Sequence, residues 1–511
     1  MISDTAAGAR LRDLSIWHAL SANGSTHAQR MAFFSDDGNL THAVFRDKCL
    51  DAASDLHAAG LAAGDRVAFL AENSVECFVL IGACARLGAI AVPLNWRLTA
   101  SELAGILADC RPSMLFADEA TRPAAEEALR ECGLKLELRL LATLGDSDAV
   151  GRLQAPLPPE PGSLNALLLI YTAAVAGKPR GATISHGNLL AASLQLSLGV
   201  DFGPDDIFLA NLPLFHIMGA GFSLSVQLAG GANVVRPRFD AADAAEAIER
   251  HAVTTIGTFP PMLATLLDAA ETGSRNLASL RAAIGLDAPG TIERLERLWP
   301  NARFWTGFGQ TETSGLVTIG RATDMPGASG APARLSAIGI VDEAGNARQP
   351  GEVGQIVVRG PTVMLGYWDD PDDEGGVFAG GWHHTGDLGS VGADGLLRFA
   401  GPAPAKLLIK TGGENVYPAE VERVLLEHPS VREAAVFGTP DERWGEAVAA
   451  AIVCETENPV TTDALSDHVA SRIARYKRPT RWLVLEQIPR DINGLFDVNA
   501  LRVNIRDAVQ G

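Results

Sequence analysis

Apolar runs of strand length alternate with amphipathic stretches through most of the chain. The runs at 66–70, 89–93 and 254–258 have the length of buried strands, and apolar residues recur with helical spacing at 102–109 and 241–250. Strands that alternate with helices form βαβ units with largely parallel sheets. The pattern therefore predicts an α/β fold whose large N-terminal region holds stacked βαβ-type sheets.

The pattern changes near residue 351, where short strands are split by glycine, proline and aspartate. These strands predict a small β-rich subdomain. The run Gly-Pro-Ala-Pro-Ala at 401–405 has the composition of a linker. Beyond it, helices are expected at 418–428 and 462–475, and strands at 431–437 and 446–454. We therefore predict an N-terminal domain of 1–400 and a small, mobile α+β C-terminal domain of 401–511.

The 511-residue chain is acidic, with a formal net charge of −19. This charge opposes nucleic-acid binding, which needs a basic surface. Its six scattered cysteines form no CxxC pair, so we expect free thiols rather than metal ligands. The start of the chain has no basic segment followed by an apolar one, and the uncharged stretch 211–235 contains polar residues and glycines. We therefore expect no signal peptide, no membrane span and a cytoplasmic location.

The stretch 171–181 has the layout of a phosphate-binding loop. An apolar run at 166–171 predicts a strand, a turn of small residues follows, and a helix is expected to start near 185–188. Backbone N–H groups in such a turn point at an anion. The candidate nucleotide contacts here are Thr172, Gly177, Lys178 and Arg180. The centre of the loop, 173–176, is Ala-Ala-Val-Ala and offers no hydroxyl donors.

Four further segments carry residues suited to acid activation. They are Asn-Leu-Pro-Leu-Phe-His at 211–216, Trp-Thr-Gly-Phe-Gly-Gln-Thr-Glu-Thr at 305–313, Gly-Trp-His-His-Thr-Gly-Asp-Leu-Gly at 381–389, and a Gly-Gly-Glu-Asn-Val-Tyr-Pro run within 406–422. A hydroxyl at Thr311 and a carboxylate at Glu312 suit a hard cation held against a triphosphate. The carboxylate of Asp387 can accept hydrogen bonds from both hydroxyls of a ribose.

With these motifs the chain resembles the adenylate-forming superfamily, which includes acyl- and aryl-CoA synthetases. The resemblance implies ATP or AMP with Mg²⁺ and CoA as cofactors, and a small-molecule carboxylic acid or acyl-CoA as partner. It implies that Glu312 holds the metal, that Thr311 serves catalysis and that His216 lies beside the acyl pocket. The other implied nucleotide and CoA contacts are Gly309, Gln310, Asp387, Lys410, Gly412, Gly413, Arg475 and Lys477.

The chain departs from the family pattern at positions that serve ATP. Ala173, Val175 and Ala176 stand in place of loop residues with hydroxyls, Pro404 in place of an arginine, and Leu495 in place of the adenylation lysine. Leucine cannot stabilise developing charge, and the loss of one such electrostatic group costs roughly 100- to 1000-fold in rate in other enzymes. We therefore expect weak ATP binding and impaired adenylation.

The sequence leaves three functions open. The first is a slow AMP-forming acyl-CoA synthetase, in which cations elsewhere compensate. The second is a non-adenylating homologue that binds an acyl group, acyl-CoA or a partner. The third is an enzyme that acts on a preformed acyl-CoA or acyl-adenylate without ATP. The basic cluster around Arg475 and Lys477 is either a contact for CoA phosphates or nucleotide, or a solvated helix end. The sequence specifies neither the acid nor the oligomeric state, monomer or homodimer.

Overall fold

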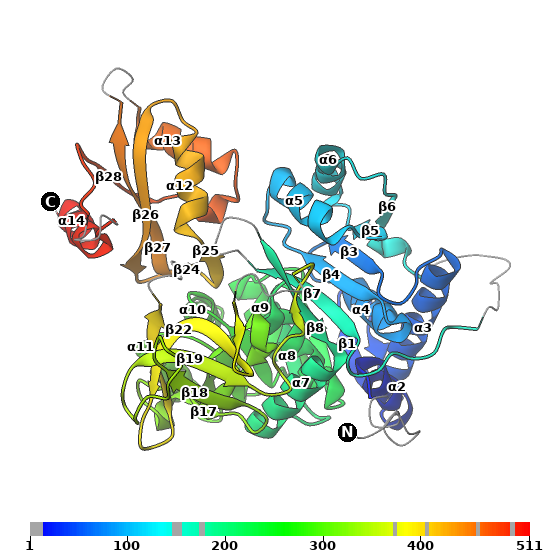
Figure 1. Cartoon of the computed structure of the whole chain (residues 1–511). Helices are drawn as coiled ribbons and strands as arrows, with labels where there is room; N and C mark the ends of the chain where they lie inside the picture. Colours follow the sequence, from blue (N-terminus) through cyan, green and yellow to red (C-terminus); the bar gives the residue numbers. More distant parts are fainter. Residues whose placement is uncertain are drawn as a thin grey trace.

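The computed structural model describes residues 14–145, 156–172, 179–370, 376–403, 408–455, 460–490 and 496–510, with side chains described as far as residue 505. It is a mixed α/β structure with a large N-terminal part and a small C-terminal part (Figure 1). The predicted fold class is therefore confirmed. None of the described helices is both long and apolar enough to cross a membrane.

The first of two large sheets in the N-terminal part has nine strands, counted over the described residues. Its spatial order is β17 (Ala331–Pro332), β16 (Thr318–Arg321), β13 (Arg303–Thr306), β12 (Ala282–Gly285), β11 (Thr255–Thr258), β9 (Ile207–Ala210), β10 (Ala232–Val235), β1 (Met31–Phe34) and β2 (Leu40–Thr41). The pairs from β13 to β1 are parallel, and those at the two edges are antiparallel. The helices between parallel strands are α8 (Ile217–Leu228), α9 (Ala241–His251), α10 (Met262–Thr272) and α11 (Pro289–Leu298).

A second sheet has seven strands among the described residues. Its order is β20 (Gly366–Tyr367), β8 (Arg180–Ser185), β7 (Ala166–Thr172), β4 (Ile90–Leu94), β3 (Arg66–Leu70), β5 (Met114–Ala117) and β6 (Leu138–Leu140). Its helices are α4 (Val75–Leu87), α5 (Ala100–Cys110), α6 (Arg122–Cys132) and, after β8, α7 (His186–Val200). The predicted strands at 66–70 and 254–258 are β3 and β11, and the predicted helices are α5 and α9.

The main apolar core lies between these two sheets. It contains buried residues of β1 and β9 from one sheet and of β3 and β7 from the other. The rings of Phe33 and Phe78 pack with centroids 5.0 Å apart, and those of Phe208 and Phe222 with centroids 6.1 Å apart. Helices α2 (Ile16–Thr26) and α3 (His42–Ala58) contribute to the same core. The core fixes the carboxyl ends of both sets of parallel strands.

A small β-rich unit follows, as predicted. It consists of β18 (Ala337–Val341), β19 (Gly354–Arg359), β21 (Phe378–Ala379), β22 (Trp382–Val391) and β23 (Leu397–Pro402). A short hairpin of β14 (Gly309–Gln310) and β15 (Gly315–Leu316) precedes it. The linker predicted at 401–405 begins too early, because Gly401 and Pro402 form the end of β23 and pair with β22. Residues 404–407 lie outside the described part, so the predicted hinge stays a prediction.

The C-terminal part is a five-stranded sheet, within the described residues, covered on both faces. Its strands are β25 (Glu414–Val416), β24 (Ile409–Thr411), β27 (Gly445–Cys454), β26 (Val431–Asp441) and β28 (Arg481–Val484). Helices α12 (Pro418–Leu426) and α13 (Thr462–Ala470) pack on one face, and α14 (Val498–Gln510) packs on the other. The helix predicted at 462–475 ends at Ala470 and is followed by a short 3-10 turn at Arg475–Lys477.

Candidate active site

A cavity of about 390 Å³ lies at the carboxyl ends of the parallel strands. Its walls come from the segments that follow β4, β9, β10, β11, β12 and β13, from the end of β7, and from β22. The turn between β24 and β25 closes it from the C-terminal part. Open α/β sheets bind ligands at this edge, because the loops after neighbouring parallel strands meet there.

Asp387 is fixed in the cavity wall by Gln310. The side-chain amide of Gln310 donates to Asp387 Oδ2 at 2.6 Å and to the carbonyl of Thr385 at 2.9 Å. The backbone N–H of Asp387 donates to the Thr385 hydroxyl at 3.1 Å. Asp387 is buried, yet it lines the cavity. The carboxylate is therefore held in one orientation, as a receptor for a vicinal diol requires.

Glu312 lies beside Asp387 in the same wall, in a 3-10 turn that also contains Thr311. The hydroxyl of Tyr367 donates to Glu312 Oε1 at 2.7 Å. Burial, and then the charge of Glu312, raise the pKa of Tyr367, so this hydroxyl stays a donor. Among the described residues no group of three or more metal-ligating side chains occurs. One carboxylate nevertheless fits Mg²⁺, which is usually held by one or two carboxylates together with substrate phosphates and water.

The side chain of Arg180 contacts the β20 segment. Its guanidinium lies 3.6 Å from the ring centroid of Tyr367 and 2.5 Å from Asp370 Oδ2. Arg180 is not among the residues that line the cavity, whereas Thr172 is. Gly177 and Lys178 lie outside the described residues. The structure thus places Arg180 behind Glu312, where it supports Tyr367, and a phosphate contact by Arg180 stays a prediction.

His216, Glu414 and Arg97 lie together in the cavity wall. Nε2 of His216 lies 3.2 Å from Glu414 Oε1, and the guanidinium of Arg97 forms an ion pair with the same oxygen. Arg97 also lies over the rings of Trp96 and Phe215. Sequence reasoning singled out His216 but missed the other two. Glu414 lay within the recognised 406–422 run, whereas nothing in the local pattern marked Arg97, which follows β4.

Gly412 and Gly413 bring the backbone of the β24–β25 turn close to two aromatic side chains. Their φ angles are 56° and 84°, in the left-handed region. A Cβ atom on Gly412 would lie 2.8 Å from the ring of Trp444, and one on Gly413 would lie 3.7 Å from Phe259. Lys410 precedes them and lines the cavity, with its ammonium 5.1 Å from the ring centroid of Phe399. Gly412 therefore leaves space for the ring of Trp444, whereas Gly413 is favoured by its left-handed backbone.

Lys477 joins the two parts of the chain. It donates to Glu102 of α5 at 2.6 Å and to Glu420 of α12 at 2.7 Å, and it is buried. Burial would lower its pKa, but the two carboxylates raise it, so the side chain is charged. It is therefore not the solvated helix end that the sequence left open. Arg475, two residues earlier, is exposed. Contact of either residue with phosphate stays a prediction.

Leu495 and the four residues before it lie outside the described part, but their neighbours do not. Arg490 and Phe496 form an antiparallel bridge, and the guanidinium of Arg490 lies 4.7 Å from the Phe496 ring. Phe496 packs on the apolar cluster beneath α14. In Figure 1, α14 lies on the side of the C-terminal sheet away from the N-terminal part. The β24–β25 turn, and not this bridge, lines the cavity.

The sequence matches the family model described as AMP-binding enzyme over residues 20–368, and the AMP-binding enzyme C-terminal domain over residues 420–495. Indoleacetate–CoA ligase from Aromatoleum aromaticum is 36% identical and covers 86% of this chain and 88% of its own.

Two solved structures of o-succinylbenzoate CoA synthetase from Bacillus subtilis are each 29% identical to this chain. A double variant bound with a product analogue has a TM-score of 0.83 and covers 97% of this chain and 98% of its own. The complex with the acyl-adenylate intermediate has a TM-score of 0.68 and covers 96% and 98%. On the strength of the matched domains, the chain belongs to the AMP-binding enzyme family of adenylate-forming, acyl-CoA synthetase-type proteins.

Proposed function

We propose that this protein joins a small carboxylic acid to CoA through an acyl-adenylate, and that adenylation is the slower of its two half-reactions. The observation that carries the proposal is the docked β24–β25 turn. It lines the same cavity as Asp387 and Glu312, whereas the bridge beside Leu495 packs beneath α14. The family resemblance implies that the C-terminal domain rotates between adenylation and thioester formation. We assign the arrangement with the docked turn to the step that uses CoA.

The likeness to solved structures supports the same placement of the C-terminal part. The described fold is more similar to the relative that holds a product analogue than to the same relative with its acyl-adenylate, with TM-scores of 0.83 and 0.68. Both comparisons cover nearly the whole chain at equal identity. The difference in TM-score at equal identity supports a placement of the C-terminal part like that in the product-analogue complex.

Each polar group in the cavity has a role in the proposed reaction. Asp387 accepts hydrogen bonds from the ribose hydroxyls of the nucleotide. Glu312 supplies one ligand to Mg²⁺, which neutralises phosphate charge when bound. In the second half-reaction the CoA sulfur attacks the acyl carbon. The C–S bond forms, the C–O bond to the phosphate breaks, AMP leaves with that electron pair, and the thiol proton passes to solvent. Gly412, Gly413 and Trp444 line the cavity into which the thiol arm would extend.

The claim that adenylation is the slower step rests on the positions where the chain differs from the family pattern for ATP. A leucine at 495 leaves the carboxylate and α-phosphate without the cation that the family resemblance implies there. In other enzymes the loss of one such group costs roughly 2.7–4 kcal/mol. The ion pair of Arg180 with Asp370 also argues against Arg180 as the replacement cation. Lys410, which lines the cavity, is the better candidate.

The proposal is tested by product analysis. The protein is incubated with a panel of carboxylic acids, Mg-ATP and CoA, and separately with the matching synthetic acyl-adenylates and CoA. We expect acyl-CoA from both mixtures, with slow formation from the acids. Asp387→Asn is the matched variant, because it keeps the shape of the wall and removes the charge that holds the ribose.

Two outcomes would replace this proposal with the alternatives. Acyl-CoA formed only from the adenylates would favour an enzyme that acts without ATP. Tight binding of acyl-CoA without any thioester formation would favour a non-adenylating homologue. Binding of CoA phosphates by the exposed Arg475 belongs to the proposal as well, whereas Lys477 is held by Glu102 and Glu420. A rise in the KM for CoA in Arg475→Ala would support the phosphate contact.

A further inference from the structure

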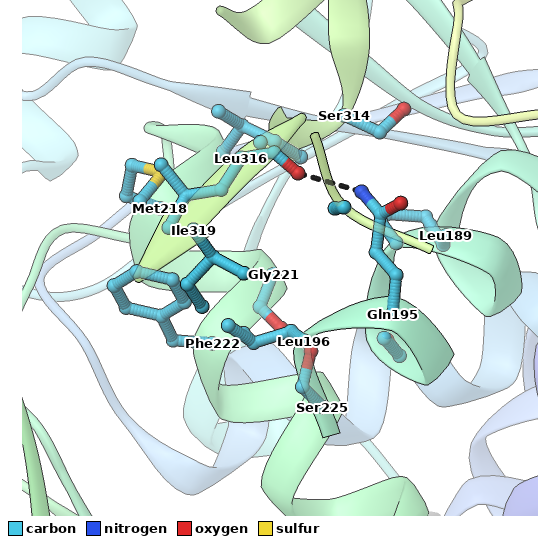
Figure 2. A pocket seen from close by; sticks show the side chains of 15 residues that line it. Leu189, Gln195, Leu196, Met218, Gly221, Phe222, Ser225, Ser314, Leu316 and Ile319 are labelled. Atoms are coloured by element: carbon cyan, nitrogen blue, oxygen red, sulfur yellow. Dashed lines mark hydrogen bonds between the residues drawn. The ribbon is translucent and has the colours of Figure 1, made fainter. Parts of the chain in front are cut away.

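A second, narrow cavity has a volume of about 20 Å³. Figure 2 shows the side chains that line it. The cavity lies between α7, α8 and the segment that contains β15 and β16. Ile217 and Met218, in the first turn of α8, line both cavities. The two cavities therefore share this turn as a common wall.

The walls of the narrow cavity are mostly apolar. They include Leu189, Leu196, Phe222, Leu316 and Ile319. A cavity needs about 10–15 Å³ to hold one water molecule, so this one admits one or two groups of about the size of a water molecule. A long alkyl chain would have to displace several buried side chains, which protein interiors resist because they are close-packed.

One polar side chain interrupts this apolar wall. Gln195 is only 2% exposed. Its amide nitrogen donates to the carbonyl of Leu316 at 2.6 Å, and its amide oxygen accepts from the Ser336 hydroxyl at 3.1 Å. A side-chain amide has two N–H donors and two acceptor lone pairs. Among the described residues, the hydrogen bonds of Gln195 thus use one of its two N–H donors and one of its two acceptor lone pairs.

Met218 lies in the wall that the two cavities share, and glycines lie on its narrow-cavity side. Gly221 and Gly315 line the narrow cavity without side chains. A Cβ atom on Gly315 would lie 3.9 Å from the sulfur of Met218, so Met218 lies against this glycine. A thioether makes favourable contacts with aromatic rings and adapts its shape. A flat ring is the acyl group that suits such a wall.

We propose, on the basis of the proposed function above, that the acid substrate is a compact aromatic acid with a small hydrogen-bonding group at its far end, such as a phenol hydroxyl. The ring lies beside Met218, and the end group enters the narrow cavity and pairs with Gln195. Gln195 and Met218 are then the residues that determine specificity.

The test measures acid binding directly by calorimetry, which needs no turnover, and thioester formation from the matching synthetic acyl-adenylates. The probes are 4-hydroxycinnamate, cinnamate, 4-phenylbenzoate and dodecanoate. The variants are Gln195→Leu and Met218→Ala. Leu198→Ala is the matched control, because Leu198 lies on α7 but is 60% exposed and outside the cavity.

We expect the wild type to prefer 4-hydroxycinnamate over cinnamate by about tenfold, the usual upper value of one neutral hydrogen bond, and to bind dodecanoate least. Gln195→Leu should abolish that preference, Met218→Ala should admit 4-phenylbenzoate, and Leu198→Ala should change neither. Tighter binding of dodecanoate, or no preference for the hydroxylated acid in the wild type, would overturn the inference without any variant. The expected acid preferences without thioester formation would overturn the proposed function alone, and no binding by any acid would overturn both.

Discussion

Nε2 of His216 lies 3.2 Å from Glu414 Oε1, although 198 residues separate them in the chain. Burial by itself would raise the pKa of Glu414, but His216 and Arg97 outweigh it and lower the pKa to about 2. Glu414 is thus an ionised group that ties the β24–β25 turn to the N-terminal part. The contact links the placement of the C-terminal part to the acyl side of the cavity.

The first prediction concerns Glu414→Gln. Removing the charge should loosen the docked turn and slow thioester formation from a synthetic acyl-adenylate by tenfold or more, because Arg97 and His216 lose the carboxylate that ties the turn to them. Pyrophosphate exchange should change less. The control is Glu427→Gln, whose ion pair with Arg423 is exposed. Equal loss in both half-reactions would contradict a role specific to the docked turn.

The second prediction concerns acid sensitivity through His186. Burial lowers the pKa of His186 to about 4, and its Nδ1 accepts from the backbone N–H of Ile16 at 3.1 Å. Because the unfolded residue titrates near 6.5, the unfolded state binds more protons between these values. The contribution of neutral His186 to the stability of the folded state is therefore full above pH 6.5 and is lost as pH falls towards 4. The loss in the free energy of unfolding is on the order of 3 kcal/mol.

Thermal unfolding from pH 4 to 7.5 checks this directly. His186→Gln should be less stable at neutral pH but should lose less stability on acidification than the wild type. Parallel curves for the two proteins would show that another group causes the acid sensitivity.

The third prediction concerns Lys477→Met. The substitution leaves the carboxylates of Glu102 and Glu420 buried without their cation, so the melting temperature should fall. Adding Glu102→Gln and Glu420→Gln should recover part of the loss. Arg475→Met, at an exposed position, serves as the control. An unchanged melting temperature with a raised KM for CoA would indicate that Lys477 serves phosphate rather than the contact between the two parts.

The fourth prediction concerns repair of adenylation. Leu495→Lys alone should help little, because the phosphates would still lack their other partners. Combined with Pro404→Arg and with the hydroxyls Ala173→Ser, Val175→Thr and Ala176→Thr, it should raise pyrophosphate exchange by more than the product of the single effects. Groups that jointly hold one transition state behave non-additively. Additive gains would indicate that each group acts alone, and no gain would indicate a site that has diverged beyond these contacts.

The sequence predicted the fold class well, because strand-length apolar runs alternate with amphipathic helices through much of the N-terminal part, as at α9 and β11. It placed the end of α13 too late, since Ala470 is followed by a bend before the short turn at Lys477. It treated Gly401 and Pro402 as linker because their composition is that of a turn. Their pairing with β22 is a long-range contact that composition does not carry.

The sequence predicted those residues of the site that lie in local motifs, and it missed those that only long-range packing brings to the cavity. Asp387, Glu312 and His216 lie in local motifs, and they all line one cavity. Arg97 and Gln195 acquire their positions only when distant strands and helices pack, so no local pattern marked them. Lys477 was singled out by its charge, but charge alone did not distinguish a phosphate contact from an ion pair with Glu102.

One measurement tests the central claim most directly: the rates of the two half-reactions in one preparation of the unmodified protein. Pyrophosphate exchange with the best acid of a panel gives adenylation, and acyl-CoA formation from the matching synthetic acyl-adenylate gives thioester formation. We predict that thioester formation is faster by roughly 100-fold or more, the effect expected for the loss of one electrostatic group. Pyrophosphate exchange as fast as thioester formation would contradict the claim. It would show that another cation already does the work of the lysine that the family pattern places where this chain has Leu495.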